Sequence, residues 1–266
     1  MRQIYPATGP EVAAGEPGTA REAAELLAGL YAYPPGVSPD RPWVRANMIA
    51  SADGAAELNG VSGGLGGPAD RLLLQVQRSL ADVILVGAGT ARAEQYGPAR
   101  PVPVLAALRR GRPATPPIAV LSARLDLDLE APLLAQAPPD ARTIVLTTEA
   151  SPAERRAAAA RHAQVIVAGA DRVTASQAIR ALTGLGHARI LSEGGPGLLG
   201  QIAAQGLLDE LCLTVSPVLA GGGQAGRILA GGPAGDLSAG RPEALWLAHV
   251  LADGAYLFCR YVRHPS

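Results

Sequence analysis

Apolar runs with the spacing of buried strands alternate along this chain with segments of helical spacing, and this alternation limits the fold more than any other feature of the sequence. Strands are expected at 42–50, 82–87, 118–121, 143–147, 164–168 and 189–191, and helices between them begin near Pro68, Ala88, Pro152, Thr174 and Pro196. Alternation of this kind builds a largely parallel sheet with helices on its faces.

The pattern changes near the C-terminus, where the apolar segments 210–218, 244–250 and 254–262 have no helical period. The Asp253-Gly254 pair between the last two is a typical hairpin turn. The sequence therefore predicts an α/β fold with one mixed, mostly parallel sheet, helices on its faces and an antiparallel C-terminal hairpin.

Three of the expected helices carry the spacing of a capping box at their start, and two of these helices lie in the alternating part of the chain. Thr174 is followed by Gln177, and Ser151 is followed by Glu154 with Pro152 between them. We expect both side-chain pairs to satisfy free N–H groups of the first helical turn.

The first 40 residues differ from the rest. Residues 1–18, rich in Pro, Gly and Ala, predict an extended arm, and a helix capped by Thr19 and Glu22 follows. No internal repeat or second composition appears later, so 41–266 is expected to form one domain on which this helix packs. The Pro- and Arg-rich stretch 100–117 is expected to be a surface loop.

Charge and composition exclude several functions. Formal net charge is zero, which argues against nucleic acid or a membrane surface as the partner, and the absence of Lys excludes lysine Schiff-base chemistry. Cys212 and Cys259 lie far apart in apolar runs and are expected to be buried thiols. The four histidines show no metal-ligand spacing, so no metal is expected. Without a signal peptide or membrane span, the sequence predicts a cytoplasmic protein that acts on a small molecule.

One expected strand, 189–191, ends in a glycine turn, Glu193-Gly194-Gly195-Pro196, before a helical segment. Adjacent glycines let the backbone approach a ligand closely, and the N–H groups of a helix start favour a phosphate. A simple helix cap explains the same residues equally well when they are taken alone.

Other strand ends carry polar or glycine residues, and ligands of open α/β sheets bind at the carboxyl ends of the strands. These ends are Asp53-Gly54, 87–90 and 122–124. Gly87, Gly89 and Thr90 form a second phosphate cradle, so a dinucleotide is expected. Arg124, close to Ser122, suggests the extra phosphate of NADP.

Two charged residues of the helix after Pro68 have two interpretations each. Asp70 lies in the first turn, where the helix dipole stabilises a carboxylate, but it also suits a hydrogen bond to a nitrogenous ring. Arg78, two turns further on, either binds a substrate phosphate or solvates the helix.

Three motifs together resemble a known family. They are MIASADG at 48–54, ILVGAGTARAE at 84–94, and LSEGGPGLLGQIAAQGLLDEL at 191–211 followed by SPVLAGGG. From about Pro42 to Val262 the chain resembles the reductase domain of the bifunctional riboflavin-biosynthesis deaminase/reductase, which has the dihydrofolate reductase fold. The zinc-binding deaminase half is absent, and 95–100 departs from the family's Asp-Pro pattern.

The resemblance implies NADPH bound across the sheet, with the nicotinamide near β-strand residues 49–50 and the pyrophosphate along 195–201. Predicted cofactor residues are Ile49, Ala50, Gly87, Gly89, Thr90, Glu94, Ser122, Arg124, Gly194, Gly195, Pro196, Gly197, Leu198 and Leu199. Predicted substrate residues are Asp53, Gly63, Arg78, Pro98, Arg100 and Glu193. Asp70 and Glu193 are the predicted catalytic residues.

The implied reaction reduces 5-amino-6-(5-phosphoribosylamino)uracil at C1′ of its opened ribose. A homodimer is also implied, because the family usually dimerises. Two alternatives stay open. One is an NADPH-dependent reductase of a pterin or another heterocycle, which Asp70 favours because Pro68-Ala69-Asp70 resembles the pterin-binding segment of dihydrofolate reductase. The other is a dinucleotide-binding protein without turnover.

Overall fold

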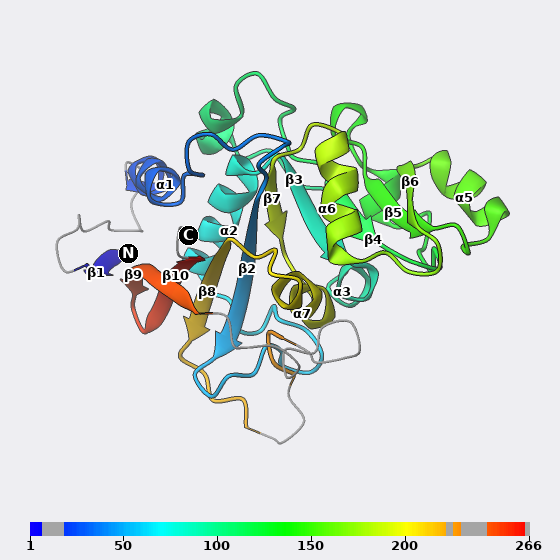
Figure 1. The fold of residues 1–266 in the computed structure, drawn as a ribbon. Helices are drawn as coiled ribbons and strands as arrows, with labels where there is room; N and C mark the ends of the chain where they lie inside the picture. Colours follow the sequence, from blue (N-terminus) through cyan, green and yellow to red (C-terminus); the bar gives the residue numbers. More distant parts are fainter. Residues whose placement is uncertain (7–18, 222–225, 230–243, 264–266) are drawn as a thin grey trace.

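The computed structural model describes residues 1–6, 19–221, 226–229 and 244–263. Its strands form one ten-stranded sheet in the order β1-β9-β10-β8-β2-β7-β3-β4-β5-β6 (Figure 1). Their bounds are β1 Arg2–Tyr5, β2 Trp43–Ser51, β3 Val83–Gly87, β4 Ile118–Leu121, β5 Ile144–Thr148, β6 Gln164–Gly169, β7 Arg189–Ser192, β8 Glu210–Ser216, β9 Leu245–Asp253 and β10 Tyr256–Arg263.

Strand directions divide the sheet into two parts. From β8 to β6 all neighbours are parallel, whereas β1, β9, β10 and β8 pair antiparallel. The predicted mostly parallel sheet with an antiparallel C-terminal hairpin is therefore confirmed.

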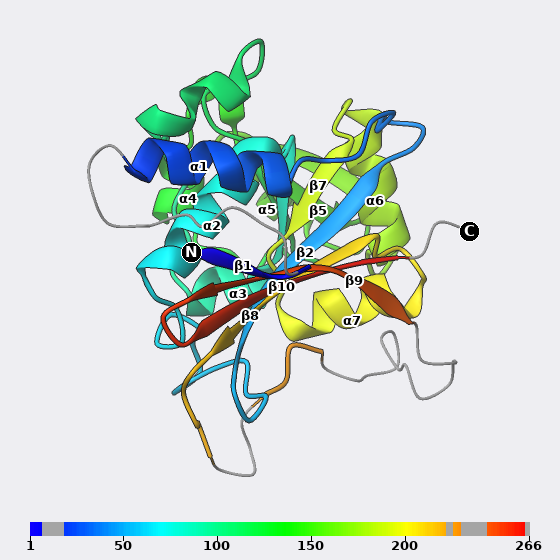
Figure 2. The ribbon, with the colours of Figure 1, turned by 90° about the vertical axis from the view of Figure 1, so that its left-hand side faces the viewer.

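Helices cover both faces of the parallel part. Their bounds are α1 Thr19–Leu30, α2 Pro68–Leu80, α3 Ala88–Ala93, α4 Pro132–Ala135, α5 Ala153–Ala160, α6 Ala175–Gly184 and α7 Pro196–Ala204, with short 3₁₀ helices η1 Pro103–Arg109 and η2 Pro139–Ala141. Figure 2 shows α1 and α2 on one side of the sheet and α6 and α7 on the other. None of the helices in the described ranges is long and apolar enough to cross a membrane.

Strand β3 is buried on both faces, which explains why its sequence is apolar without interruption. Val83 and Leu85 pack into the core shared with α6 and α7, whereas Ile84 and Val86 pack into the core on the opposite face, which includes α4 and α5 residues. A strand buried on both faces needs no polar alternation. The antiparallel part has a third core, formed with α1, α2 and η1.

The N-terminal segment joins the sheet. β1 pairs with β9 at the sheet edge, and α1 packs against α2 and η1. The expected arm at 7–18 lies outside the described residues. Alternation over only four residues is too short to predict β1 from the sequence.

The expectation of a surface loop at 100–117 is wrong for part of that segment. Within it, η1 carries Arg109, whose side chain is buried and donates to the Ser79 and Ala81 carbonyls at the end of α2. The last carbonyls of a helix lack partners within it, and a guanidinium satisfies several at once. Composition alone does not reveal this use of an arginine.

Of the three predicted capping boxes, the one at Thr174 forms, whereas the side chain of Thr19 lies outside the described residues. Thr174 Oγ1 accepts the Gln177 N–H at 3.3 Å, and Gln177 Oε1 accepts the Thr174 N–H at 2.8 Å. The expected Ser151 box is wrong, since Pro152 is the cap residue of α5 and the Ser151 hydroxyl donates to the Thr148 carbonyl at 2.6 Å.

A buried charge cluster fastens the central strands to the N-terminal segment. The side chains of Arg45 on β2 and Glu210 on β8 are 0% exposed, and their closest atoms lie 2.8 Å apart. Arg260 on β10 forms a second ion pair with Glu210, also at 2.8 Å. Arg45 further donates to the Tyr31 carbonyl, just beyond α1, at 2.7 Å. The cluster therefore joins three strands and the end of α1.

Candidate active site

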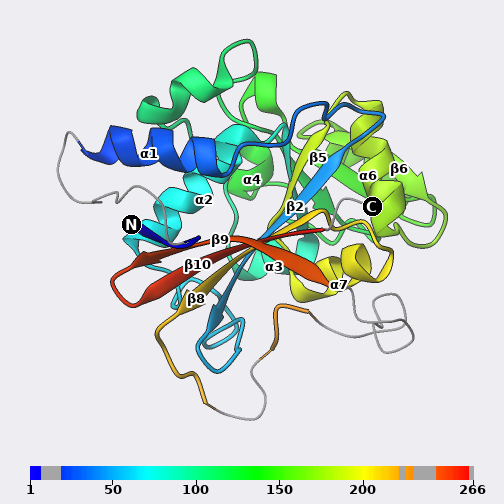
Figure 3. The same cartoon turned by 60° about the vertical axis from the view of Figure 1, so that its left-hand side comes forward.

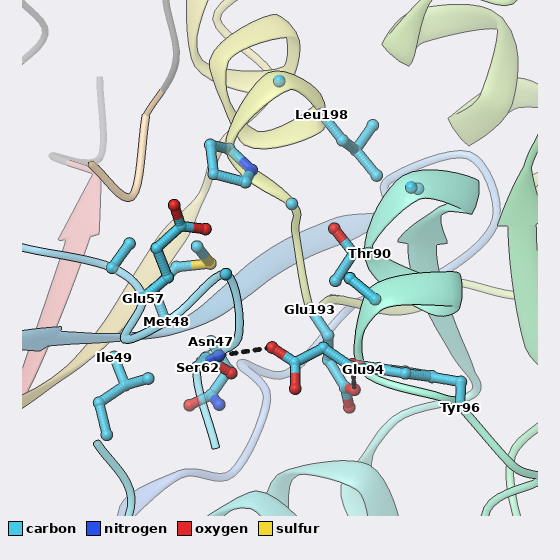
Figure 4. A pocket seen from close by; sticks show the side chains of 18 of the residues that line it. Asn47, Met48, Ile49, Glu57, Ser62, Thr90, Glu94, Tyr96, Glu193 and Leu198 are labelled. Atoms are coloured by element: carbon cyan, nitrogen blue, oxygen red, sulfur yellow. Dashed lines mark hydrogen bonds between the residues drawn. The ribbon is translucent and has the colours of Figure 1, made fainter. Parts of the chain in front are cut away.

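A cavity of about 510 Å³ opens at the carboxyl ends of the parallel strands β2, β3 and β7 (Figure 4). This is where ligands of open α/β sheets bind. Eleven predicted site residues line it: Ile49, Asp70, Gly87, Gly89, Thr90, Glu94, Glu193, Gly195, Pro196, Gly197 and Leu198. Two of the four strand ends named from the sequence, 87–90 and 193–197, therefore meet at this cavity.

The glycine turn between β7 and α7 forms one wall of the cavity with its backbone. Gly194 has φ +82°, and its carbonyl accepts the Gly87 N–H at 2.9 Å, which joins the two predicted phosphate cradles. A Cβ atom on Gly195 would collide with Thr90 Oγ1. Residue 195 thus has no room for a side chain, and the backbone at the start of α7 packs directly against Thr90, which also lines the cavity.

Glu193 lies at the end of the same strand and binds two side chains. Its Oε1 accepts the Arg78 Nε–H at 2.7 Å, and its Oε2 accepts from Arg78 Nη2 at 2.6 Å and from the Tyr96 hydroxyl at 2.7 Å. The Glu193 side chain is 4% exposed and that of Arg78 26%. Such a bidentate, poorly hydrated pair fixes the carboxylate in one orientation.

Burial and the neighbouring Glu193 charge raise the pKa of Tyr96 well above its ordinary value, so the hydroxyl stays protonated and remains a donor. Tyr96 is a site residue that the sequence analysis missed. The only signal for it was its place two residues after Glu94, in the segment that departs from the family pattern.

Glu94 connects α3 to the loop before α2. Its Oε1 accepts the Ser62 N–H at 2.6 Å, as the dashed line in Figure 4 shows. Ser62 lines the cavity, whereas its neighbour Gly63, the predicted substrate residue, is exposed and lies outside it.

Two polar side chains, Asn47 of β2 and Asp70 of α2, also line the cavity. Asp70 hydrogen-bonds the Thr214 side chain, and its burial raises the pKa of the carboxyl above its ordinary value. Asn47 Oδ1 accepts from Gln77 Nε2 at 3.1 Å, so the Asn47 amide N–H groups take no part in that bond. Asn47, like Tyr96, was not predicted from the sequence.

A second cavity of about 880 Å³ adjoins the first, since Ser62, Thr90, Glu94, Tyr96 and Glu193 are among the residues that line both. It contains the predicted substrate residues Arg78, Pro98 and Arg100. Predicted cofactor and substrate residues therefore lie on either side of Glu193.

Several predicted residues lie outside both cavities. Ala50 and Leu199 are buried, Ser122 is buried at the end of β4, and Arg124 is exposed just beyond it. Asp53 accepts hydrogen bonds from the Ser51 hydroxyl and from the N–H groups of Ala220 and Gly221. These bonds lower the pKa of Asp53 to about 2. The structure thus places Asp53 in a loop-stabilising contact, as is usual for an Asp-Gly turn.

No group of three or more metal-binding side chains occurs in the part of the chain that the structure describes. The polar groups of the cavity walls are instead backbone, hydroxyl, amide, carboxylate and guanidinium groups.

Known proteins resemble this chain in sequence and in fold. Two curated relatives carry the name 2,5-diamino-6-ribosylamino-4(3H)-pyrimidinone 5′-phosphate reductase. The relative from Methanothermobacter thermautotrophicus is 28% identical over 72% of this chain and 85% of its own length. The relative from Archaeoglobus fulgidus is 29% identical over 68% of this chain and 83% of its own.

Two solved structures resemble this chain in fold. A pyrimidine reductase-like protein from Corynebacterium diphtheriae superposes with a TM-score of 0.76, at 28% identity, over 90% of this chain and 99% of the other. Acinetobacter baumannii RibD shares the fold, with a TM-score of 0.65 at 21% identity, over 85% of this chain and 59% of the other.

The family model described as RibD C-terminal domain matches residues 42–254. The family expected from the three motifs is thereby confirmed, together with its reductase fold. This chain belongs to the RibD C-terminal domain family.

Proposed function

We propose that this protein is an NADPH-dependent reductase of a phosphorylated ribosylaminopyrimidine in riboflavin biosynthesis. The observation that carries the proposal is the junction of two cavities at Glu193, one built as a dinucleotide cradle and the other containing arginines. The names of the two archaeal relatives support the same substrate class.

The cofactor cavity fits a dinucleotide. Gly87, Gly89 and Gly195 bring backbone close to the cavity, and the N-terminal turn of α7 favours the charge of a pyrophosphate. When bound, NADPH supplies a hydride. The chain's part is to hold the nicotinamide near Ile49 and to keep water away from the reacting atoms.

Glu193 is the proposed catalytic residue. As the ribose ring opens, the C1′–O4′ bond breaks, O4′ takes up the proton that the reaction consumes, and the lone pair of the nitrogen bonded to C1′ forms an iminium there. A fixed carboxylate nearby stabilises that positive charge. Arg78 and Tyr96 hold the carboxylate in place for this task. Arg78 lines the second cavity, and its Nη1 makes no bond to Glu193, so together with Arg100 it would bind the ribose phosphate.

One observation favours the pterin alternative: Asp70 lines the cofactor cavity near Ile49, so its carboxylate suits a nitrogenous ring bound beside the nicotinamide. NADPH oxidation, followed by absorbance, separates the candidates. Turnover is expected with the ribosylaminopyrimidine phosphates and not with dihydrofolate. NADPH binding without oxidation on any of them would support a protein that binds the dinucleotide without turnover.

A homodimer belongs to the same proposal. On the β8–β10 ladder, Leu211, Leu213 and Val215 alternate with buried residues and lie beside Leu257 and Tyr261 in register. Figure 3 shows these strands with no helix in front of them. A half-exposed apolar sheet face of this kind suits a second copy of the chain. Sedimentation of the purified protein at twice the monomer mass would support this.

Replacing Gly195 with Ala is expected to raise the Kd for NADPH at least tenfold, because the added methyl group displaces the Thr90 hydroxyl and narrows the cradle. Fluorescence titration with NADPH measures this. Gly184→Ala in α6 is the matched control, since a Cβ there meets nothing within 4 Å. Equal affinity in both variants would show that the turn is only a helix cap.

A further inference from the structure

A third cavity, of about 480 Å³, lies at the amino ends of the parallel strands, opposite to the ends that form the candidate active site. Asp82, Ile144, Gln164 and Arg189 line it, and they stand at or next to the starts of β3, β5, β6 and β7. Cavities that bind small molecules usually measure about 300–1,000 Å³. This cavity is therefore large enough for a ligand, and no described residue lines both it and the cofactor cavity.

Positive charge predominates in the wall of this third cavity. Its charged side chains are Arg109, Arg112, Arg142, Arg189, Asp82 and Asp140. Asp82 Oδ1 forms ion pairs with Arg112 and Arg189, both at 3.1 Å, and its Oδ2 accepts the N–H groups of Ala188 and Arg189 at 3.1 and 2.9 Å. The carboxylate of Asp82 is thus fully used. Asp140, the other carboxylate among the described lining residues, is exposed.

Helix capping uses only part of these guanidinium groups. Arg109 donates from Nε and Nη1 to carbonyls at the end of α2 and in the loop after η1, and Arg142 donates from Nε and Nη2 to carbonyls at the end of α5. Within the described residues, Arg109 Nη2, Arg142 Nη1 and Arg189 Nη1 make no hydrogen bond. Arg109 is only 5% exposed, yet its Nη2 is not sealed from solvent. Donors therefore remain for a ligand.

The arginines of this wall repel one another. Burial and the charge of Arg112 lower the pKa of Arg109 to about 10, and burial and the charge of Arg189 lower the pKa of Arg112. His187, the remaining titratable residue of the lining, adds no compensating charge, because burial lowers its pKa from 6.5. An anion bound among these cations would offset their repulsion.

We propose that the third cavity is an anion site for a small phosphorylated molecule, separate from the cofactor and substrate cavities. Phosphate oxygens match the planar fork of a guanidinium, and one phosphate can accept from several arginines at once. The volume exceeds that of a single phosphate, so pyrophosphate or a phosphate with an organic group fits this cavity. Arg109 also lines the substrate cavity, so the two cavities meet at its side chain.

Calorimetric titration of pyrophosphate into the NADPH-saturated protein at low ionic strength tests the proposal. The double variant Arg142→Gln, Arg189→Gln removes two cations that line neither the cofactor nor the substrate cavity. The Kd for pyrophosphate is expected to rise at least tenfold, because charged hydrogen bonds are lost, whereas the Kd for NADPH should not change. Arg180→Gln, at an exposed position of α6, is the control with the same chemical change and should bind pyrophosphate as the wild-type protein does.

Arg78→Gln shows whether pyrophosphate binds in the substrate cavity instead. A loss of affinity in Arg78→Gln and none in the double variant would overturn the proposal, and so would a wild-type protein that binds no pyrophosphate. A crystal of the wild-type protein with pyrophosphate gives a result that does not depend on the folding of a variant. Density beside Arg109 and Arg189 supports the site, and density only at Arg78 contradicts it. Neither measurement follows turnover, so the proposed reductase activity is tested separately.

Discussion

Replacing Glu193 with Gln is expected to lower kcat by about 10²- to 10⁴-fold, in the range seen when a positioned catalytic group is removed. The carboxylate offers two oxygens to three donors, from Arg78 and Tyr96. An amide replaces one oxygen with a donor, so at least one of these bonds becomes a donor facing a donor. The variant also loses the negative charge that stabilises the iminium.

Steady-state kinetics together with NADPH titration identify the cause of this loss. The account expects kcat to fall while the Kd for NADPH stays within a few fold, because the cradle at Gly195 is untouched. Glu154→Gln, at an exposed position in α5, should leave kcat unchanged. A Glu193→Gln variant that turns over at the wild-type rate would remove Glu193 from the mechanism.

Replacing Glu210 with Gln is expected to lower the free energy of unfolding by about 3–5 kcal/mol, the usual cost of removing one partner of a buried ion pair. Arg45 is 0% exposed and Arg260 16%, so the substitution leaves two guanidinium groups facing a neutral amide. Trp43 would lose a charged acceptor as well. Urea denaturation of both proteins measures the difference.

The same residue predicts a pH dependence. Burial alone would raise the pKa of Glu210, but the charges of Arg45 and Arg260 outweigh it and lower the pKa from its ordinary 4.5 to about 2. A carboxyl whose pKa is lower in the folded protein stabilises it above the unfolded-state value. That stabilisation should therefore decline as the pH falls from about 4.5 toward 2, and Glu210→Gln should show a flatter profile there.

Glu25→Gln is the matched control, because Glu25 pairs with Arg21 on the exposed face of α1. Exposed pairs contribute little, so no measurable loss is expected. Equal stability of the two variants would show that the buried cluster does not stabilise the fold.

The sequence predicts the parallel sheet and the meeting of the ends of β3 and β7 because both follow from local patterns. β3 is apolar on both faces, and Gly194 and Gly195 mark a turn that only residues without a side chain can form at this distance from Met48 and Thr90. Such features are encoded within a few residues, and the order of the parallel strands then brings their ends together.

Contacts between distant segments could not be predicted in this way. Tyr96 and Glu193 are 97 positions apart, and Arg45 and Glu210 are 165 apart. No periodicity links residues at such separations. Arg109 shows the same limit, since only the fold shows that its guanidinium ends up at the last turn of α2.

The residues predicted to bind the adenosine end of the cofactor lie apart from the other predicted cofactor residues. Ser122 and Arg124 follow β4, but they lie outside both cavities, while Gly195 and Thr90 line the first. A phosphate site at the end of β4 therefore remains a prediction. Arg124→Ala should raise the KM for NADPH more than that for NADH if it is correct.

Transfer of deuterium from NADPH tests the central claim most directly. The wild-type protein is incubated with NADPH deuterated at both C4 positions and with the diamino ribosylaminopyrimidine phosphate, and the product is examined by mass spectrometry and NMR. The account predicts one deuterium at C1′ of the ribityl chain. A product without deuterium, or NADPH that binds and is never oxidised, would contradict it.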